Sequence, residues 1–83
     1  MRAIMKNPVI QIDPEIQSGE PVFFQTRVPI KSLFDYLSTG ESLETYLEDF
    51  PAVTKEQALV VIEQSGHLLL QAYQIINAEN IVR

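Results

Sequence analysis

Apolar residues recur at helical spacing in two successive segments that begin near residue 30. The first segment carries the stripe Ile30, Leu33, Phe34 and Leu37, and the second carries Leu43, Tyr46, Leu47 and Phe50. Steps of three or four residues place such side chains on one face of an α-helix. The pattern therefore predicts two amphipathic helices within residues 29–53.

Proline, glycine and a capping residue mark the ends of these two helices. Pro29 suits the first position of a helix, because the N–H that it lacks would have no partner there. Gly40 suits the position just after a helix end. Ser42 is a candidate N-cap for the second helix, and Pro51 closes that helix.

Residues 54–77 form the third and most apolar predicted helix, and Thr54 followed by Gln57 fits a capping box at its start. One stripe contains Ala58, Val61, Ile62, Ser65, Leu68, Leu69, Ala72, Ile75 and Ile76. Further apolar residues fall off that stripe, and a helix that is apolar over more than one face is buried on more than one face. We therefore predict a homodimer, with an interface formed by Leu59, Val60, Leu69, Leu70, Tyr73 and Ile76.

Gly66 interrupts this apolar helix. In a helix interior, glycine costs about 1 kcal/mol relative to alanine. It marks a kink, a break or a close helix contact, and the sequence leaves these three alternatives open.

Residues 1–28 predict an arm and a short β element. Val9–Ile12 and Val22–Phe24 have high strand propensity. Asp13–Pro14 ends the first strand, and Ser18–Pro21 has the composition of a turn. The two strands can pair as a hairpin with a long loop, which needs packing beneath it to be stable.

Arg27 is the most conspicuous charged residue of this region. It either binds a phosphate or a partner carboxylate, or pairs with Asp13 or Glu15 and ties the arm to the helices. We favour the second interpretation, because a planar guanidinium suits bidentate carboxylate contacts. The predicted structural clasp consists of Asp13, Glu15, Gly19, Pro21, Arg27 and Pro29.

Length and composition indicate one domain, residues 1–83, that gains from self-association. A chain of 83 residues buries only about 60–65% of its unfolded surface. There is no cysteine to supply disulfides, yet 46% of the residues are hydrophobic. A homodimer is the usual way in which a small domain gains further core.

The charge and the longest apolar runs bear on partners and location. The net charge of −5 disfavours a broad electrostatic grip on nucleic acid. Met1–Lys6 is followed by no apolar signal-peptide core. Ala58–Ile62 is the longest uninterrupted apolar run, and it is far too short to span a bilayer. We therefore predict a cytoplasmic protein without a membrane segment.

The order of helices resembles a trihelical helix-turn-helix unit, with residues 42–66 as the motif itself. The candidate DNA contacts are Lys31, Lys55, Gln57 and Gln64. Glu56 and Glu63 also face outward on the third helix, so cationic support for phosphate binding is thin. The alternative is that the trihelical unit serves only as a scaffold.

Nothing in the chain indicates a catalytic residue, a metal site or a cofactor. His67 is the only histidine, so neither a zinc site nor a proton relay has enough members. Asp13 and Glu15 are more typical of a cap and a solvated charge than of an acid–base pair. The acidic series Glu41, Glu44 and Glu48 is typical of a solvated helix face. We predict that the protein is not an enzyme.

Over half of the chain matches a family pattern without a break in order. The matching residues are Ile12-Asp13-Pro14-Glu15-Ile16, Gly19-Glu20-Pro21-Val22, Thr26-Arg27-Val28-Pro29-Ile30, Leu33, Gly40-Glu41-Ser42-Leu43-Glu44, Asp49-Phe50-Pro51 and Thr54-Lys55-Glu56-Gln57-Ala58. In these residues the chain resembles the domain-of-unknown-function 433 family of small prokaryotic proteins. It departs from the family at Gln25, where glycine is usual, and at Val53, where leucine is commoner.

The resemblance implies a mainly α fold, a homeodomain-like three-helix (helix-turn-helix) bundle with a small N-terminal β-hairpin or arm. Its members are similar to antitoxins and are often paired with a PIN-like toxin. The expected function is therefore that of an antitoxin-like partner of a PIN-like toxin that can also bind DNA. The alternative is a dimeric structural or adaptor protein on the same scaffold that does not bind DNA.

Overall fold

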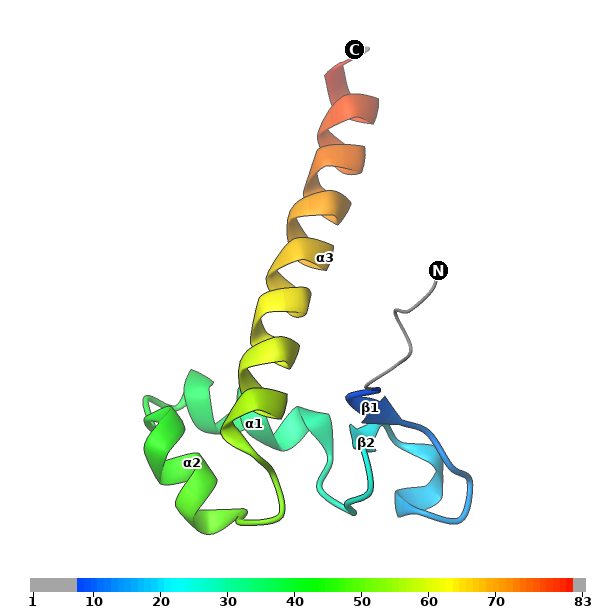
Figure 1. Cartoon of the computed structure of the whole chain (residues 1–83). Coiled ribbons are helices and arrows are strands. Elements are labelled where there is room, and N and C mark those ends of the chain that lie inside the picture. Colours follow the sequence, from blue (N-terminus) through cyan, green and yellow to red (C-terminus); the bar gives the residue numbers. More distant parts are fainter. Residues whose placement is uncertain (1–7, 82–83) are drawn as a thin grey trace.

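The computed structural model describes the backbone of residues 8–81 (Figure 1). The elements in chain order are β1 (Ile10–Gln11), η2 (Gln17–Gly19), β2 (Val22–Phe23), α1 (Ile30–Ser38), α2 (Leu43–Asp49) and α3 (Lys55–Ile81). Over this range the chain is mainly helical, with three α-helices and a two-stranded antiparallel sheet. The predicted mixture of helices and a small N-terminal β element is confirmed.

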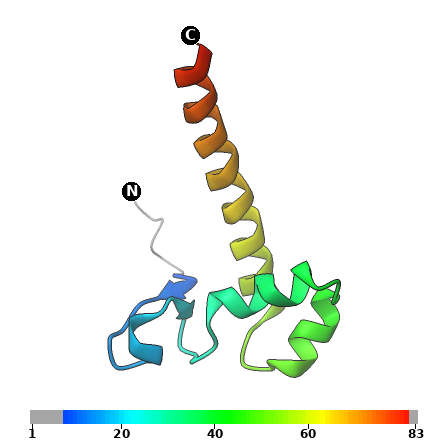
Figure 2. The same ribbon diagram turned by 180° about the vertical axis from the view of Figure 1, so that it is seen from behind.

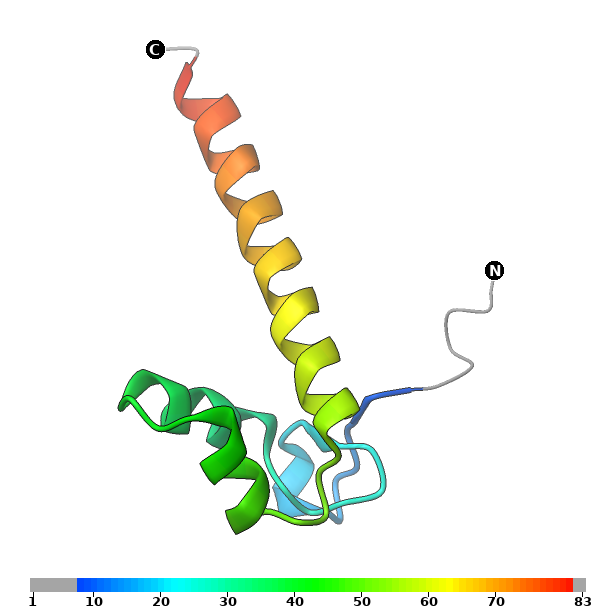
Figure 3. The same cartoon turned by 60° about the vertical axis from the view of Figure 1, so that its left-hand side comes forward.

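The molecule consists of a head and a projecting tail. The head, residues 8–65, contains the sheet, α1, α2 and the first turns of α3. The tail, residues 66–81, is the remainder of α3 and extends away from the head as one straight helix, seen from opposite sides in Figure 1 and Figure 2. The same separation is visible in Figure 3. At 27 residues, α3 is about 40 Å long.

The core lies entirely in the head. Its buried side chains are Val22, Phe23, Leu33, Tyr46, Val53, Ala58 and Val61. The hydroxyls of Ser32 and Tyr46 form a hydrogen bond of 2.8 Å that joins α1 to α2. Burial raises the pKa of Tyr46, and the bond to Ser32 partly opposes this rise. Tyr36 packs edge-on against Tyr46, with ring centroids 5.1 Å apart.

The predicted helix end at Gly40 and the predicted N-cap at Ser42 are confirmed. Gly40 has a φ of +91°, and its N–H donates to the Leu37 carbonyl at 3.1 Å. The Glu41 N–H donates to the Tyr36 carbonyl at 3.0 Å. These two bonds form a Schellman motif, which needs a left-handed residue at the Gly40 position. Ser42 is the N-cap of α2, and its Oγ accepts from the Thr45 N–H at 3.0 Å.

The capping box at the start of α3 is also confirmed. Gln57 Oε1 accepts from the Thr54 N–H at 3.0 Å, and Thr54 Oγ1 accepts from the Gln57 N–H at 3.1 Å. In addition, Gln57 Nε2 donates to the Phe24 carbonyl at 3.4 Å. The Gln57 side chain therefore caps the start of α3 and also connects this helix to the N-terminal element.

The N-terminal element is shorter than predicted but is paired on both sides of β2. Ile10 lies opposite Phe23 in the antiparallel register of β1 and β2. On the other edge, the Phe23 N–H donates to the Val28 carbonyl and the Ile30 N–H to the Pro21 carbonyl, both at 3.0 Å. The short sheet thus continues directly into α1.

Gln25 occupies a backbone conformation that favours glycine. The Thr26 N–H donates to the Phe23 carbonyl at 3.0 Å, which closes a β-turn, and Gln25 at its third position has a φ of +62°. A positive φ at that position is typical of a type II turn. The Gln25 N–H donates to Gln11 Oε1 at 2.7 Å, which fastens the turn to β1.

The predicted ion pair of Arg27 with Asp13 or Glu15 is wrong. Arg27 is exposed, and the salt bridge found among the side chains of residues 8–76 joins Lys31 to Asp35 at 2.9 Å. Asp13 Oδ1 instead accepts from the Glu15 N–H at 2.9 Å, so this carboxylate caps its own turn. Because a backbone N–H only two residues away satisfies the Asp13 carboxylate, this group does not need the distant guanidinium of Arg27.

Backbone contacts hold the arm in place of that ion pair. Gly19 has a φ of +86°, and Pro21 supplies the carbonyl that accepts from Ile30. Thr26 Oγ1 donates to the Phe23 carbonyl at 2.8 Å and accepts from the Val28 N–H at 3.0 Å. Pro29 is the N-cap of α1 rather than its first helical residue.

Replacing Gln25 with glycine should stabilise the fold. A left-handed non-glycine residue costs about 1–2 kcal/mol, which the greater unfolded-state entropy of glycine offsets only in part. We expect Gln25→Gly to raise the free energy of unfolding by about 0.5–1 kcal/mol in urea titrations. Gln25→Ala, which removes the same side chain and keeps the strain, is the control and should leave stability nearly unchanged. A loss of stability in Gln25→Gly would contradict the strained turn.

Replacing Arg27 with alanine should have little effect on stability. The side chain is exposed and forms no hydrogen bond or ion pair within residues 8–76, and such surface substitutions usually change stability by less than about 0.5 kcal/mol. Thermal and urea unfolding of Arg27→Ala test this expectation. A fall of about 2 kcal/mol or more in the free energy of unfolding would instead support the ion pair predicted from the sequence.

Candidate interaction surface

The tail displays large apolar side chains that the head does not cover. Those more than half exposed are Leu68, Leu69, Leu70, Tyr73, Ile75 and Ile76. By contrast, Ala58 and Val61, at the start of the same helix, are buried in the core. A contiguous exposed apolar surface of this kind marks an interaction site.

Between residues 63 and 76, the charged, amide and imidazole side chains of α3 form one narrow stripe that bounds this surface. Successive residues turn by about 100° around a helix, which places Glu63, Gln64, His67, Gln71 and Gln74 on one side. The apolar residues occupy the remaining arc of roughly 220°. One neighbouring helix covers only part of such an arc, so the surface has room for two neighbours.

Two seams with alternating steps of three and four residues run along the apolar arc. The inner seam consists of Ala58, Val61, Ser65, Leu68, Ala72 and Ile75. The outer seam consists of Leu59, Ile62, Gly66, Leu69, Tyr73 and Ile76. The inner seam is buried in the head at Ala58 and Val61 and exposed from Leu68 onward. The outer seam is already exposed at Leu59, by 46%.

The structure brings most of the predicted dimer residues together. Leu59, Leu69, Tyr73 and Ile76 all belong to the outer seam, and Leu70 borders it. Val60 does not, because it lies on the far side of α3 and is half-buried. It lines an open pocket of about 640 Å³ together with Pro8 and Val9 of the arm. Of the predicted set, Val60 is therefore separated from the exposed apolar surface.

The predicted DNA contacts do not form one basic surface. Lys31 lies on α1 and is paired with Asp35. Gln57 has partners for both of its side-chain polar atoms. Lys55 and Gln64 are exposed on α3, with Glu56 and Glu63 between them in sequence. Among the described residues, two of these four side chains are thus committed to contacts within the head.

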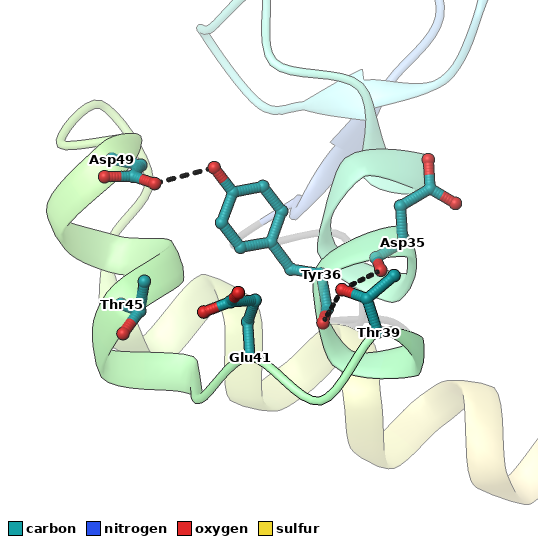
Figure 4. Close-up of a pocket in the computed structure, with 6 residues that line it drawn as sticks. All are labelled: Asp35, Tyr36, Thr39, Glu41, Thr45 and Asp49. Atoms are coloured by element: carbon teal, nitrogen blue, oxygen red, sulfur yellow. Dashed lines mark hydrogen bonds between the residues drawn. The ribbon is translucent and has the colours of Figure 1, made fainter.

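An acidic cleft lies between α1 and α2 (Figure 4). It has a volume of about 570 Å³ and is lined by Asp35, Tyr36, Thr39, Glu41, Thr45 and Asp49. The Tyr36 hydroxyl donates to Asp49 Oδ2 at 2.7 Å, and this bond to a carboxylate raises the pKa of Tyr36. Within residues 8–76, whose side chains the structure describes, no three acidic or histidine side chains converge as they would on a metal ion.

Sequence reasoning interpreted Glu41, Glu44 and Glu48 as a solvated helix face and missed the contact of Asp49 with Tyr36. The acidic residues of α1 and α2 are indeed exposed. Tyr36 lies off the apolar stripe of α1 but joins the aromatic cluster of Tyr46 and Phe50. An aromatic residue next to an amphipathic stripe was the available indication of this contact.

None of the helices in the described part of the chain combines the length and the apolar character needed to cross a lipid bilayer. His67, the one histidine of the chain, is exposed on the polar stripe of α3. It therefore lies apart from both the acidic cleft and the apolar seams.

Comparison with known proteins finds a sequence family and a crystal structure that are similar to this chain. The sequence model of "Protein of unknown function (DUF433)" matches residues 10–63. A crystal structure of a DUF433 member protein from Anabaena variabilis is similar at 27% identity and a TM-score of 0.62, over 90% of this chain and 70% of that chain. No curated protein matches the sequence.

The two matches end at different places. The family match stops at residue 63, before the tail begins. Residues 1–63 make up only about three quarters of the chain, so a structural match over 90% of it must include part of α3 beyond residue 63. The likeness in structure therefore extends into the tail.

Proposed function

Because the chain belongs to the DUF433 family of proteins of unknown function, we propose its role from the surface that it displays. The protein is a small cytoplasmic, homodimeric interaction protein of the antitoxin type. It acts by binding rather than by catalysis, and its partner is a PIN-like toxin.

The uncovered inner seam of the tail carries this proposal. Leu68 and Ile75 are 66% and 62% exposed and lie two helical turns apart on one side of α3. An amphipathic helix that projects from a folded head is a recurrent device for binding a partner protein, because its apolar anchors enter a groove on that partner. Shielding these side chains from water would supply the binding energy.

The proposed partner fits this arrangement better than a nucleic acid does. Over residues 8–81 the lysines and arginines are Arg27, Lys31 and Lys55, and Lys31 is neutralised by Asp35. Counterion release from DNA needs several unpaired cations on one face. We therefore propose that the helix-turn-helix part of the head serves as a scaffold for α3.

The proposal requires a PIN-like reading frame beside this gene, and the protein that it encodes provides the first test. Leu68→Glu combined with Ile75→Glu should weaken its binding by about tenfold or more, since buried apolar anchors dominate such interfaces. Binding is measured by calorimetry on purified proteins, and relief of toxin-induced growth arrest provides a second readout.

Gln71→Glu combined with Gln74→Glu is the matched control. It adds the same two negative charges on the polar stripe of the same helix and should leave binding nearly unchanged. If the wild-type protein does not bind the PIN-like protein, or if the apolar double variant binds it as tightly as wild type, the antitoxin role is wrong.

Upstream DNA provides a separate test of the scaffold interpretation. We expect the affinity for the promoter region to equal that for a random duplex, and Lys55→Ala to change neither. Fluorescence anisotropy over a salt titration measures both affinities. A marked preference for the promoter that Lys55→Ala abolishes would show that the helix-turn-helix reads DNA.

A further inference from the structure

Gly66 has no explanation within a single chain. It lies in the interior of α3, where glycine is less favourable than any residue except proline. The helix runs through it without a break, and its φ is not in the left-handed region. A Cβ built on Gly66 would meet no atom within 4 Å. Neither a turn nor a crowded neighbour in the described chain therefore requires glycine here.

The position of Gly66 on the outer seam indicates why a glycine is needed there. Leu59 and Ile62 precede it, and Leu69 and Tyr73 follow it, at alternating steps of three and four residues. It is thus the one gap in the middle of an apolar seam whose other members are exposed, except for Ile62, which packs against the core. The distance between two packed helices depends on the side chains at their crossing point, and glycine allows the closest approach of two backbones.

We propose that a second copy of this chain packs on the outer seam, with the two α3 helices crossing at Gly66. In a twofold-symmetric dimer of this kind the two Gly66 residues face each other. The proposal deepens the homodimeric part of the proposed function and does not depend on the toxin partner.

The distribution of charge favours a second copy as the occupant. The chain carries a net charge of −5, yet residues 64–78 contain no Asp, Glu, Lys or Arg. Two identical helices can therefore meet along this segment without repulsion between like charges. A partner selected by charge would find nothing to pair with on the same segment.

The size of the core supports the same occupant. The buried hydrophobic residues of the described chain number seven, and the sequence has no cysteine to form a disulfide. Small domains with so little core commonly gain stability by oligomerisation. Burying Leu69, Tyr73 and Ile76 against their counterparts would enlarge the core, whereas a transient partner would leave the free chain without it.

Gly66→Leu tests the crossing. The Cβ of a leucine at this site would meet no atom within 4 Å, and leucine improves helix propensity, so the head should remain folded, as checked by circular dichroism. At a close crossing the same side chain is forced into the opposing backbone. We expect the dissociation constant of the dimer to rise by about tenfold or more in sedimentation equilibrium. Gln74→Leu, on the polar stripe, is the control and should not weaken the dimer.

A cysteine variant decides the question if Gly66→Leu does not fold. The chain has no cysteine of its own, so Gly66→Cys can form only an intermolecular disulfide, and it should do so readily under mild oxidation. Gln74→Cys should not. The proposal fails if the wild-type chain is monomeric at every concentration, or if a dimer tolerates Gly66→Leu unchanged.

The two failures have different meanings. A monomeric wild-type protein would remove the homodimeric part of the proposed function as well. A dimer that is indifferent to Gly66→Leu would remove only this crossing. Neither result affects the toxin test, which rests on Leu68 and Ile75 of the inner seam.

Discussion

The side-chain amide of Gln57 is the contact on which the arrangement of the molecule depends. Its oxygen caps the first turn of α3, and its nitrogen reaches the Phe24 carbonyl of the N-terminal element. One residue thus fixes both where α3 begins and what it is fastened to. Ala58 and Val61 then bury the next turn against Leu33 and Tyr46 in the core. The direction in which the tail leaves the head follows from these contacts.

Features of the fold that rest on neighbouring residues could be predicted from the sequence. The Schellman motif at Gly40, the N-cap at Ser42 and the capping box of Thr54 and Gln57 each close within six residues, and all are present. Their chemistry depends on side-chain type and short spacing. The end of α1 and the starts of α2 and α3 could therefore be predicted before the fold was known.

Contacts between distant residues were less accessible. The ion pair expected for Arg27 required the arm to bring Asp13 or Glu15 to it, but Asp13 found a nearer donor in the Glu15 N–H. The hydrogen bond from Tyr36 to Asp49 was not predicted, because it depends on how α1 packs on α2. Side-chain charge alone does not determine which of several partners is reached first.

The candidate surface shows a different limit. The periodicity of α3 identified an apolar arc too wide for one neighbour, and the structure exposes that arc from Leu68 onward. A pattern of side chains records that a face must be covered but not by what. Two further observations indicate which partner covers this apolar surface. Residues 64–78 contain no Asp, Glu, Lys or Arg that would select a charged partner, and Gly66 weakens its own helix without relieving any contact in its own chain.

The division of the arc into two seams reconciles a permanent neighbour with an exchangeable one. An isolated helix of mainly apolar residues is poorly stable in water, so at least one seam must be covered for the tail to persist. The outer seam, with its central glycine, suits a close and permanent contact. The inner seam can then remain open on a helix that is already held straight. A partner that docks there would meet a preformed surface and lose little entropy in ordering it.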